Sequence, residues 1–167
     1  HKLFNKAPPS DAVLSQQIGN KIRPTAVGEI GRTYQLGQAV EVRPFGELRA
    51  GDETLVRVGA DLTIGSVGRG ELFARESISG QRYRVIYQSG PGYSLTMGAD
   101  IAYVSQSVYL PEDRGYELSS HRDRVRVGVN WQGENASAFY GLTYLGKEFE
   151  AQSEGQVIGS IRVKLRF

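Results

Sequence analysis

Apolar and polar residues alternate along most of this sequence with a period of two. The final segment shows the alternation most clearly, with only Ile158 out of place. Its apolar face consists of Val157, Gly159, Ile161, Val163, Leu165 and Phe167. Because successive side chains of a strand point to opposite faces, this pattern predicts a β-strand with one apolar face and one polar face.

The same alternation recurs in three earlier segments and, more weakly, in four others. The three clear segments are 56–64, 95–103 and 125–131, and the weaker ones are 25–36, 40–49, 82–87 and 136–145. Turn-forming residues separate them at 50–52, 89–92 and 133–135. The sequence therefore predicts an all-β fold, an antiparallel β-meander over 25–167 with seven or eight strands of about 10 residues.

Residues 1–24 do not follow this pattern. Pro8-Pro9-Ser10-Asp11 precedes a short stretch that ends at Gly19, which predicts a helix over 10–18 with Ser10 as its N-cap. We expect 1–24 to be a loop with one short helix and 1–167 to form a single domain, or the C-terminal part of one. The sequence begins at His1 without an initiator methionine or signal peptide, which indicates a mature or truncated product.

Composition excludes several classes of protein. The 167 residues include no cysteine, which excludes disulfide scaffolds, thiolate metal sites and cysteine nucleophiles. No run of about 18 apolar residues is present, so a transmembrane helix is not expected. The net charge of +2 argues against a nucleic acid partner. The 21 glycines indicate many turns and small residues on the faces of strands.

The alternation alone fits both a soluble barrel and an outer-membrane barrel. Four features favour the membrane: charged residues on the polar faces, aromatic residues near strand ends, the strand length, and a final strand that ends on Phe167. A strand of this kind at the C-terminus is read by the barrel assembly machinery of the bacterial outer membrane. We therefore expect a transmembrane β-barrel in the outer membrane, with a soluble ligand-binding β-barrel as the alternative.

The stretch from Tyr140 to Phe167 resembles the end of the lipid A 3′-O-deacylase family of Gram-negative outer membranes. Glu148-Phe149-Glu150-Ala151-Gln152 is its most specific part. The segment 98–110 resembles an extracellular loop region of the family, although Pro111-Glu112-Asp113 replaces the usual Asp-Gly pair. His1-Lys2-Leu3 with Gln16-Gln17-Ile18 resembles the family segment in which a histidine leads into a short helix. The resemblance covers most of this chain and about the second half of the family's length.

The resemblance implies a twelve-stranded barrel that hydrolyses an acyl ester of lipid A in lipopolysaccharide near the extracellular side, with calcium as a possible cofactor. His1 matches the catalytic histidine of the family. The other catalytic positions of the family, an Asn-Asp pair and a hydroxyl residue, would precede His1. Histidine suits the role of a general base because its pKa lies near neutrality.

Basic residues flank the expected helix. Lys2, Lys6, Lys21 and Arg23 are candidates for binding the phosphates of lipid A, and a solvated rim is the alternative. No metal ligand is identified, although Glu148, Glu150 and Glu154 form an acidic group that binds a bridging cation or keeps a loop hydrated. His121 is expected to lie on a loop surface.

The order of the strands predicts a topology. If the C-terminus is periplasmic, loops 146–155 and 106–121 are extracellular and loop 132–135 is periplasmic. We favour seven spanning strands, with 67–93 as a long irregular periplasmic connection, because this arrangement places the helix over 10–18 on the extracellular side. A non-enzymatic barrel, structural or porin-like, remains the alternative function.

Overall fold

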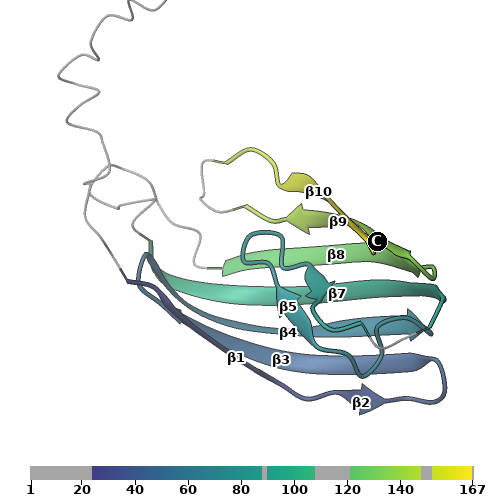
Figure 1. Ribbon diagram of the computed structural model, residues 1–167. Helices are drawn as coiled ribbons and strands as arrows, with labels where there is room; N and C mark the ends of the chain where they lie inside the picture. The colour runs from purple at the N-terminus through teal and green to yellow at the C-terminus, as the bar shows by residue number, and fades with distance from the viewer. Residues whose placement is uncertain (1–23, 88–89, 108–120, 148–151, 167) are drawn as a thin grey trace, which may run out of the picture.

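The computed structural model describes residues 24–87, 90–107, 121–147 and 152–166. Within these ranges the chain forms strands and no helix (Figure 1). The strands are β1 (Ala26–Gly31), β2 (Tyr34–Gln35), β3 (Val40–Ala50), β4 (Glu53–Gly65), β5 (Phe73–Arg75), β6 (Arg82–Arg84), β7 (Gly92–Ser107), β8 (His121–Gln132), β9 (Ala136–Leu145) and β10 (Gln156–Leu165). The helix predicted over 10–18 lies outside the described residues.

The long strands form one antiparallel sheet in the order β1-β3-β4-β7-β8-β9-β10, with the short β2 paired to β3. β4 pairs directly with β7, with Val58 opposite Ile101, so the chain between Gly65 and Gly92 adds no strand to this sheet. The predicted all-β antiparallel arrangement is confirmed in the described part of the chain. That part has ten strands instead of the seven or eight expected, and β1 has only six residues. In that part, β1 and β10 are the two edges of the sheet.

The alternation in the sequence produces two faces of opposite polarity. Val58 and Val127 lie on the apolar face and are 55% and 41% exposed, whereas Asp61 and Arg126 lie on the polar face and are 5% and 3% exposed. This distribution is the reverse of the one in a soluble protein, where charged side chains are exposed and aliphatic ones are buried. The polar face is buried because another part of the same chain covers it.

Residues 66–87, which we call the inner segment, lie against this polar face (Figure 1). Arg75 Nη2 donates to Asp61 Oδ2 over 2.7 Å, which joins the segment to β4. Gln81 Nε2 donates to the hydroxyl of Thr143 over 3.1 Å and to the carbonyl of Leu142 over 3.2 Å, which joins it to β9. The segment contains β5 and β6, which pair with each other.

The prediction that the connection over 67–93 adds no strand to the main sheet is confirmed as far as Gly92, where β7 begins. The connection is not wholly irregular, because it contains the β5–β6 hairpin, and it lies against the polar face. Its periplasmic location stays a prediction. The inner segment lies against the polar face because it provides hydrogen-bond partners for that face. Charged groups on a buried face need partners, and this segment supplies Arg75 and Gln81 as donors.

Two weaker strand predictions are also corrected. The predicted strand over 25–36 is divided into β1 and β2, and only Arg82–Arg84 of the stretch 82–87 is a strand. The division lies opposite Pro44 of β3, whose carbonyl accepts a hydrogen bond from Arg32 N over 3.1 Å. The nitrogen of Pro44 points to the same side as its carbonyl but carries no hydrogen, so one ladder bond is missing there.

Candidate functional site

A basic cavity of about 480 Å³ lies on the polar face, at the end of the sheet where β3 ends and β8 begins. We call it the arginine cavity, and its charged residues are Arg49, Glu53, Arg57, Arg122, Asp123 and Arg124. The strand ends that lead into residues 1–23, 108–120 and 148–151 all lie at this end of the sheet. The cavity therefore lies at the end of the sheet where β1 begins, where β7 ends and where β9 ends.

Acidic groups balance the arginines only in part. Arg122 Nη1 lies 2.9 Å from Glu53 Oε1, and Arg49 Nη2 lies 3.2 Å from Glu47 Oε1. The Nε atoms of Arg49 and Arg122 are buried and have no hydrogen-bond acceptor. Since a guanidinium has five N–H donors and a buried donor without an acceptor is costly, these groups favour a ligand that brings anionic oxygens.

Deeper in the cavity the arginines are held in position by carboxylates. Arg57 contacts both Glu47, at 3.0 Å, and Asp100, at 3.1 Å. Arg124 donates to the two oxygens of Asp100 over 2.9 and 3.2 Å, which is the bidentate geometry that fixes a guanidinium most firmly. The arginines on the floor of the cavity are therefore held by several contacts. Arg49 and Arg122 near its mouth each have one carboxylate partner and one buried N–H without an acceptor.

The tip of the inner segment forms one wall of the cavity. Arg124 Nη1 donates to the carbonyls of Ser77 and Ile78 over 3.1 and 3.0 Å. The turn that carries these carbonyls is closed by Glu76, whose carboxylate accepts the backbone N–H groups of Ile78 at 2.9 Å and Ser79 at 2.7 Å. Burial raises the pKa of Glu76, but the hydrogen bonds from Ile78 and Ser79 outweigh it and hold the pKa below its ordinary value.

The candidate residues taken from the sequence lie outside the region that the structure describes. This applies to the catalytic candidate His1, to the substrate-binding candidates Lys2, Lys6, Lys21 and Arg23, and to Ser10, Glu148 and Glu150. Glu154 is described and is exposed. His121 is the first residue of β8, is exposed, and contacts the ring of Tyr103 edge-on with centroids 5.7 Å apart.

Sequence reasoning placed Arg57, Arg124 and Asp100 on polar strand faces but did not single out the arginine cavity. The available signal was the run Arg122, Arg124 and Arg126, three arginines on one face of one strand. Such a row of like charges on a buried face indicates either acidic partners or an anionic ligand. Each of the three arginines has a carboxylate partner in the structure, and Arg122 keeps a buried Nε–H without an acceptor.

A metal site is not formed by the described part of the chain. No group of three or more histidine, aspartate or glutamate side chains there is arranged to hold a metal ion. The described residues therefore provide no cluster of acidic or histidine side chains for the calcium ion that the family resemblance implies, and we assign no chemical step to a metal.

Comparison with solved structures identifies the architecture. The chain has the fold of LpxR from Salmonella typhimurium. The TM-score is 0.70 at 18% sequence identity, and the match covers 90% of this chain and 54% of LpxR. LpxR is a lipid A 3′-O-deacylase, so the resemblance stated from the sequence is confirmed at the level of the fold.

This chain spans about half the length of LpxR. No protein-family model matches the sequence, and a search of curated proteins finds no match. Among the described residues no helix is long and apolar enough to cross a membrane.

Proposed function

We propose that this chain forms part of an outer-membrane β-barrel that hydrolyses an acyl ester of lipid A. The observation that carries the proposal is the arginine cavity on the inner face of a sheet with the LpxR fold. Lipid A combines phosphate groups with ester-linked acyl chains, so a site for it needs cationic donors close to an apolar surface. The arginine cavity and the exposed apolar face supply both.

The apolar face supports insertion in a membrane. Its aromatic residues lie near both ends of the strands: Tyr103 and Tyr144 at the end that bears the arginine cavity, and Tyr93 and Trp131 at the other. Tyr93 and Tyr103 are ten residues apart on β7, or about 33 Å along the strand. At a tilt of about 40° this corresponds to about 25 Å across the membrane, the height of the apolar band of outer-membrane barrels.

The orientation follows from the direction of the last strand. If the end of β10 is periplasmic, as we expected from the sequence, then the arginine cavity opens at the extracellular end of the sheet. Lipid A occupies the outer leaflet of the outer membrane, so its phosphates and the cavity would lie at the same level. The order of the strands also brings the start of β1 to this end.

In this proposal His1 is the general base that activates water or a hydroxyl group for attack on the ester carbonyl. Lys2, Lys6, Lys21 and Arg23 join Arg49 and Arg122 in binding phosphate oxygens. The remaining catalytic groups belong to the part of the family's length that precedes His1. Calcium enters this proposal through the family resemblance alone.

The test uses the full-length protein that contains this chain, folded in detergent and incubated with lipopolysaccharide and calcium. We expect mass spectrometry to show lipid A that has lost one acyl chain, and His1→Gln to abolish this loss. His121→Gln is the matched control, because the sequence contains two histidines and His121 is exposed at the start of β8. A folded wild-type barrel that leaves lipid A intact would reject the enzymatic proposal. Addition of a chelator tests calcium separately.

The second candidate is a non-enzymatic outer-membrane barrel. A porin-like role is disfavoured by the inner segment, which covers the polar face between β4 and β9 where a pore would need open space. A structural role is distinguished by the assay above. Extraction of the native protein from cells without detergent would instead support a soluble ligand-binding barrel and reject both membrane proposals.

A further inference from the structure

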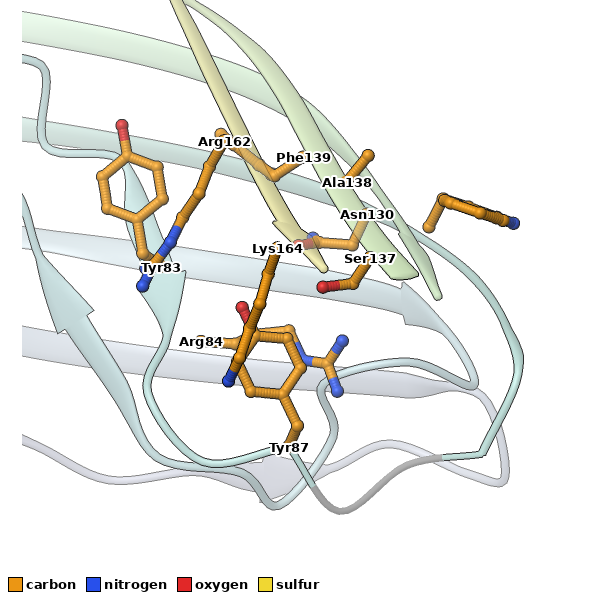
Figure 2. A pocket seen from close by; sticks show the side chains of 10 residues that line it. Tyr83, Arg84, Tyr87, Asn130, Ser137, Ala138, Phe139, Arg162 and Lys164 are labelled. Atoms are coloured by element: carbon orange, nitrogen blue, oxygen red, sulfur yellow. The ribbon is translucent and has the colours of Figure 1, made fainter. Parts of the chain in front are cut away.

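A second pocket on the polar face lies at the end of the sheet opposite the arginine cavity. It is formed between β8, β9, β10 and the inner segment (Figure 2). We call it the β10 pocket and define it by Tyr83, Tyr87, Asn130, Ser137, Arg162 and Lys164. In the sheet, Ser137 is the register partner of Lys164, so these two residues are neighbours on adjacent strands.

The cations of β10 in this pocket contact aromatic rings instead of carboxylates. The Arg162 guanidinium carbon lies 5.5 Å from the centroid of the Tyr83 ring, and Lys164 Nζ lies 4.0 Å from that of Tyr87. Within the described ranges neither cation forms an ion pair. The neighbouring Arg84 differs, since its Nη2 lies 2.7 Å from Glu71 Oε1. Among the described residues, these two positive charges therefore have no anionic partner.

Asn130 provides an independent indication of a ligand. It is 4% exposed, and its side-chain amide nitrogen Nδ2 is buried without a hydrogen-bond acceptor. Ser137, 8% exposed, adds a hydroxyl group to the same pocket. Figure 2 shows the polar ends of Asn130 and Ser137 beside Lys164. A buried amide donor without an acceptor costs about 1–3 kcal/mol, which an acceptor atom in the pocket would remove.

The chemistry of these donors selects the ligand. A water molecule could accept the hydrogen bond of Asn130, but it would leave the charges of Arg162 and Lys164 unbalanced. The free volume is about 10 Å³, which is room for roughly one oxygen-sized atom. The ligand therefore inserts one oxygen into the pocket that Asn130 and Ser137 line, and keeps its others beside the two cations. Arg162 and Lys164 are exposed on the edge strand, so they are free to turn toward it.

We propose that the β10 pocket binds a phosphate oxyanion. A phosphate group has several oxygens in different directions, which matches a set of donors that come from β8, β9 and β10. The free volume of about 10 Å³, against about 480 Å³ in the arginine cavity, leaves no room for a phosphate that carries acyl chains, so we assign the phosphate to a soluble ion or phosphomonoester. This site differs from the arginine cavity in place and residues, and it does not depend on the proposed lipid A activity.

The experiment measures binding of inorganic phosphate to the full-length protein in detergent by isothermal titration calorimetry. Chloride at equal ionic strength is the comparison for a non-specific effect of charge. We expect saturable binding of phosphate that chloride does not reproduce. Vesicles that contain phosphatidylglycerol form the second arm, and we expect them not to compete, because the small free volume of the pocket does not admit a phosphate attached to a diacylglycerol.

Two variants test the pocket itself. Asn130→Asp replaces the buried donor by a carboxylate of the same shape and is expected to weaken phosphate binding at least tenfold, as is Arg162→Gln combined with Lys164→Gln. The matched control is Lys147→Gln, which removes an exposed positive charge at the other end of the sheet and should leave binding unchanged. The electrophoretic shift between heated and unheated samples verifies that each variant is folded.

The outcomes are decisive in either direction. Absence of phosphate binding by the wild type, or equal affinity of the wild type and the folded Asn130→Asp variant, overturns the proposal. Competition by anionic vesicles retains a phosphate site but overturns its assignment to a soluble phosphate. Loss of binding in both pocket variants, with the control unchanged, supports it.

Discussion

Asp61 of β4 and Arg126 of β8 form an ion pair with a distance of 2.7 Å, although β7 lies between their two strands. Gly98 of β7 is the register partner of both residues. A Cβ atom at Gly98 would lie 2.6 Å from Arg126 Nε and 2.7 Å from Asp61 Oδ1. The two side chains therefore meet above a strand that has no side chain at that point.

Replacement of Gly98 by valine is expected to break this ion pair. The new side chain would occupy the space of both charged groups and leave them buried without each other, which costs about 3–5 kcal/mol for a buried pair. We expect a loss of unfolding free energy of about 3 kcal/mol in urea titrations of the detergent-folded protein.

Gly28→Val is the control for this substitution. It also places valine in a strand, but a Cβ at Gly28 meets nothing within 4 Å, so the change should stay within about 0.5 kcal/mol. Equal stability of the Gly98→Val variant and the wild type would show that the pair above β7 does not stabilise the sheet.

The Asp61–Arg126 pair also illustrates how far the sequence predicts the fold. Alternation assigns both residues to polar faces, because the period of two within each strand determines which of its side chains share a face. It does not predict that the two residues meet, since this requires the register of three strands and a glycine in the middle one. The strands were therefore predictable, and their contacts were not.

The inner segment was not predictable for a different reason. It alternates only weakly and only over 82–87, and its anchors are distant in the sequence, as with Gln81 and Thr143. The arginine cavity likewise combines residues from β3, β4 and β8. The candidates His1 and Lys2 came from a family resemblance. Such a resemblance is recognised from short sequence motifs, so it requires no knowledge of which residues contact each other in the fold.

Arg75 is predicted to hold the inner segment in place. Its guanidinium lies 2.7 Å from Asp61 Oδ2, 2.6 Å from Glu29 Oε2, and 3.8 Å from the centroid of the Phe45 ring. Arg75→Ala removes all three contacts and leaves the two carboxylates with fewer partners. We expect the segment to detach, so that the variant conducts ions in planar lipid bilayers at a level at least several-fold above the wild type.

The control for Arg75→Ala is Arg32→Gln. Arg32 is exposed and contacts the ring of Tyr34 at 5.4 Å, so its loss should not change the conductance. If the Arg75→Ala variant is folded and its conductance equals that of the wild type, contacts other than those of Arg75 hold the inner segment in place.

Acidification is expected to loosen the tip of the inner segment through Glu76. Its pKa is lower in the folded protein than the ordinary value of 4.5, because hydrogen bonds from Ile78 and Ser79 favour the charged form despite partial burial. A carboxyl group with a depressed pKa stabilises the fold above its unfolded pKa, and this stabilisation is lost as the pH falls through the folded value. Stability conferred by Glu76 is therefore complete at pH 7 and declines below about pH 4.5.

Hydrogen exchange of peptides that contain residues 72–86 measures this effect, after correction for the intrinsic pH dependence of exchange. We expect several-fold faster exchange at pH 3.5 than at pH 7 for the wild type. Glu76→Gln should exchange at pH 7 about as fast as the acidified wild type. A variant whose protection equals that of the wild type at pH 7 would exclude this role of the charge.

Arg122 at the mouth of the arginine cavity is expected to contribute to the affinity for lipopolysaccharide. Its side chain keeps a buried Nε–H without an acceptor while Nη1 contacts Glu53 at 2.9 Å, so it can donate to a phosphate without losing its present partner. A hydrogen bond to a charged group contributes about 1.5–3 kcal/mol, and Arg122→Gln should therefore raise the Kd for lipopolysaccharide about tenfold or more. If the residue only binds phosphate, KM should rise while kcat is retained.

Displacement of a fluorescent lipopolysaccharide measures the affinity, with Arg32→Gln as the exposed control. The difference in affinity between the two variants should diminish as the salt concentration is raised, because the contact is electrostatic. Equal affinities for the two variants at low salt would mean that the cavity does not receive the phosphates of lipid A.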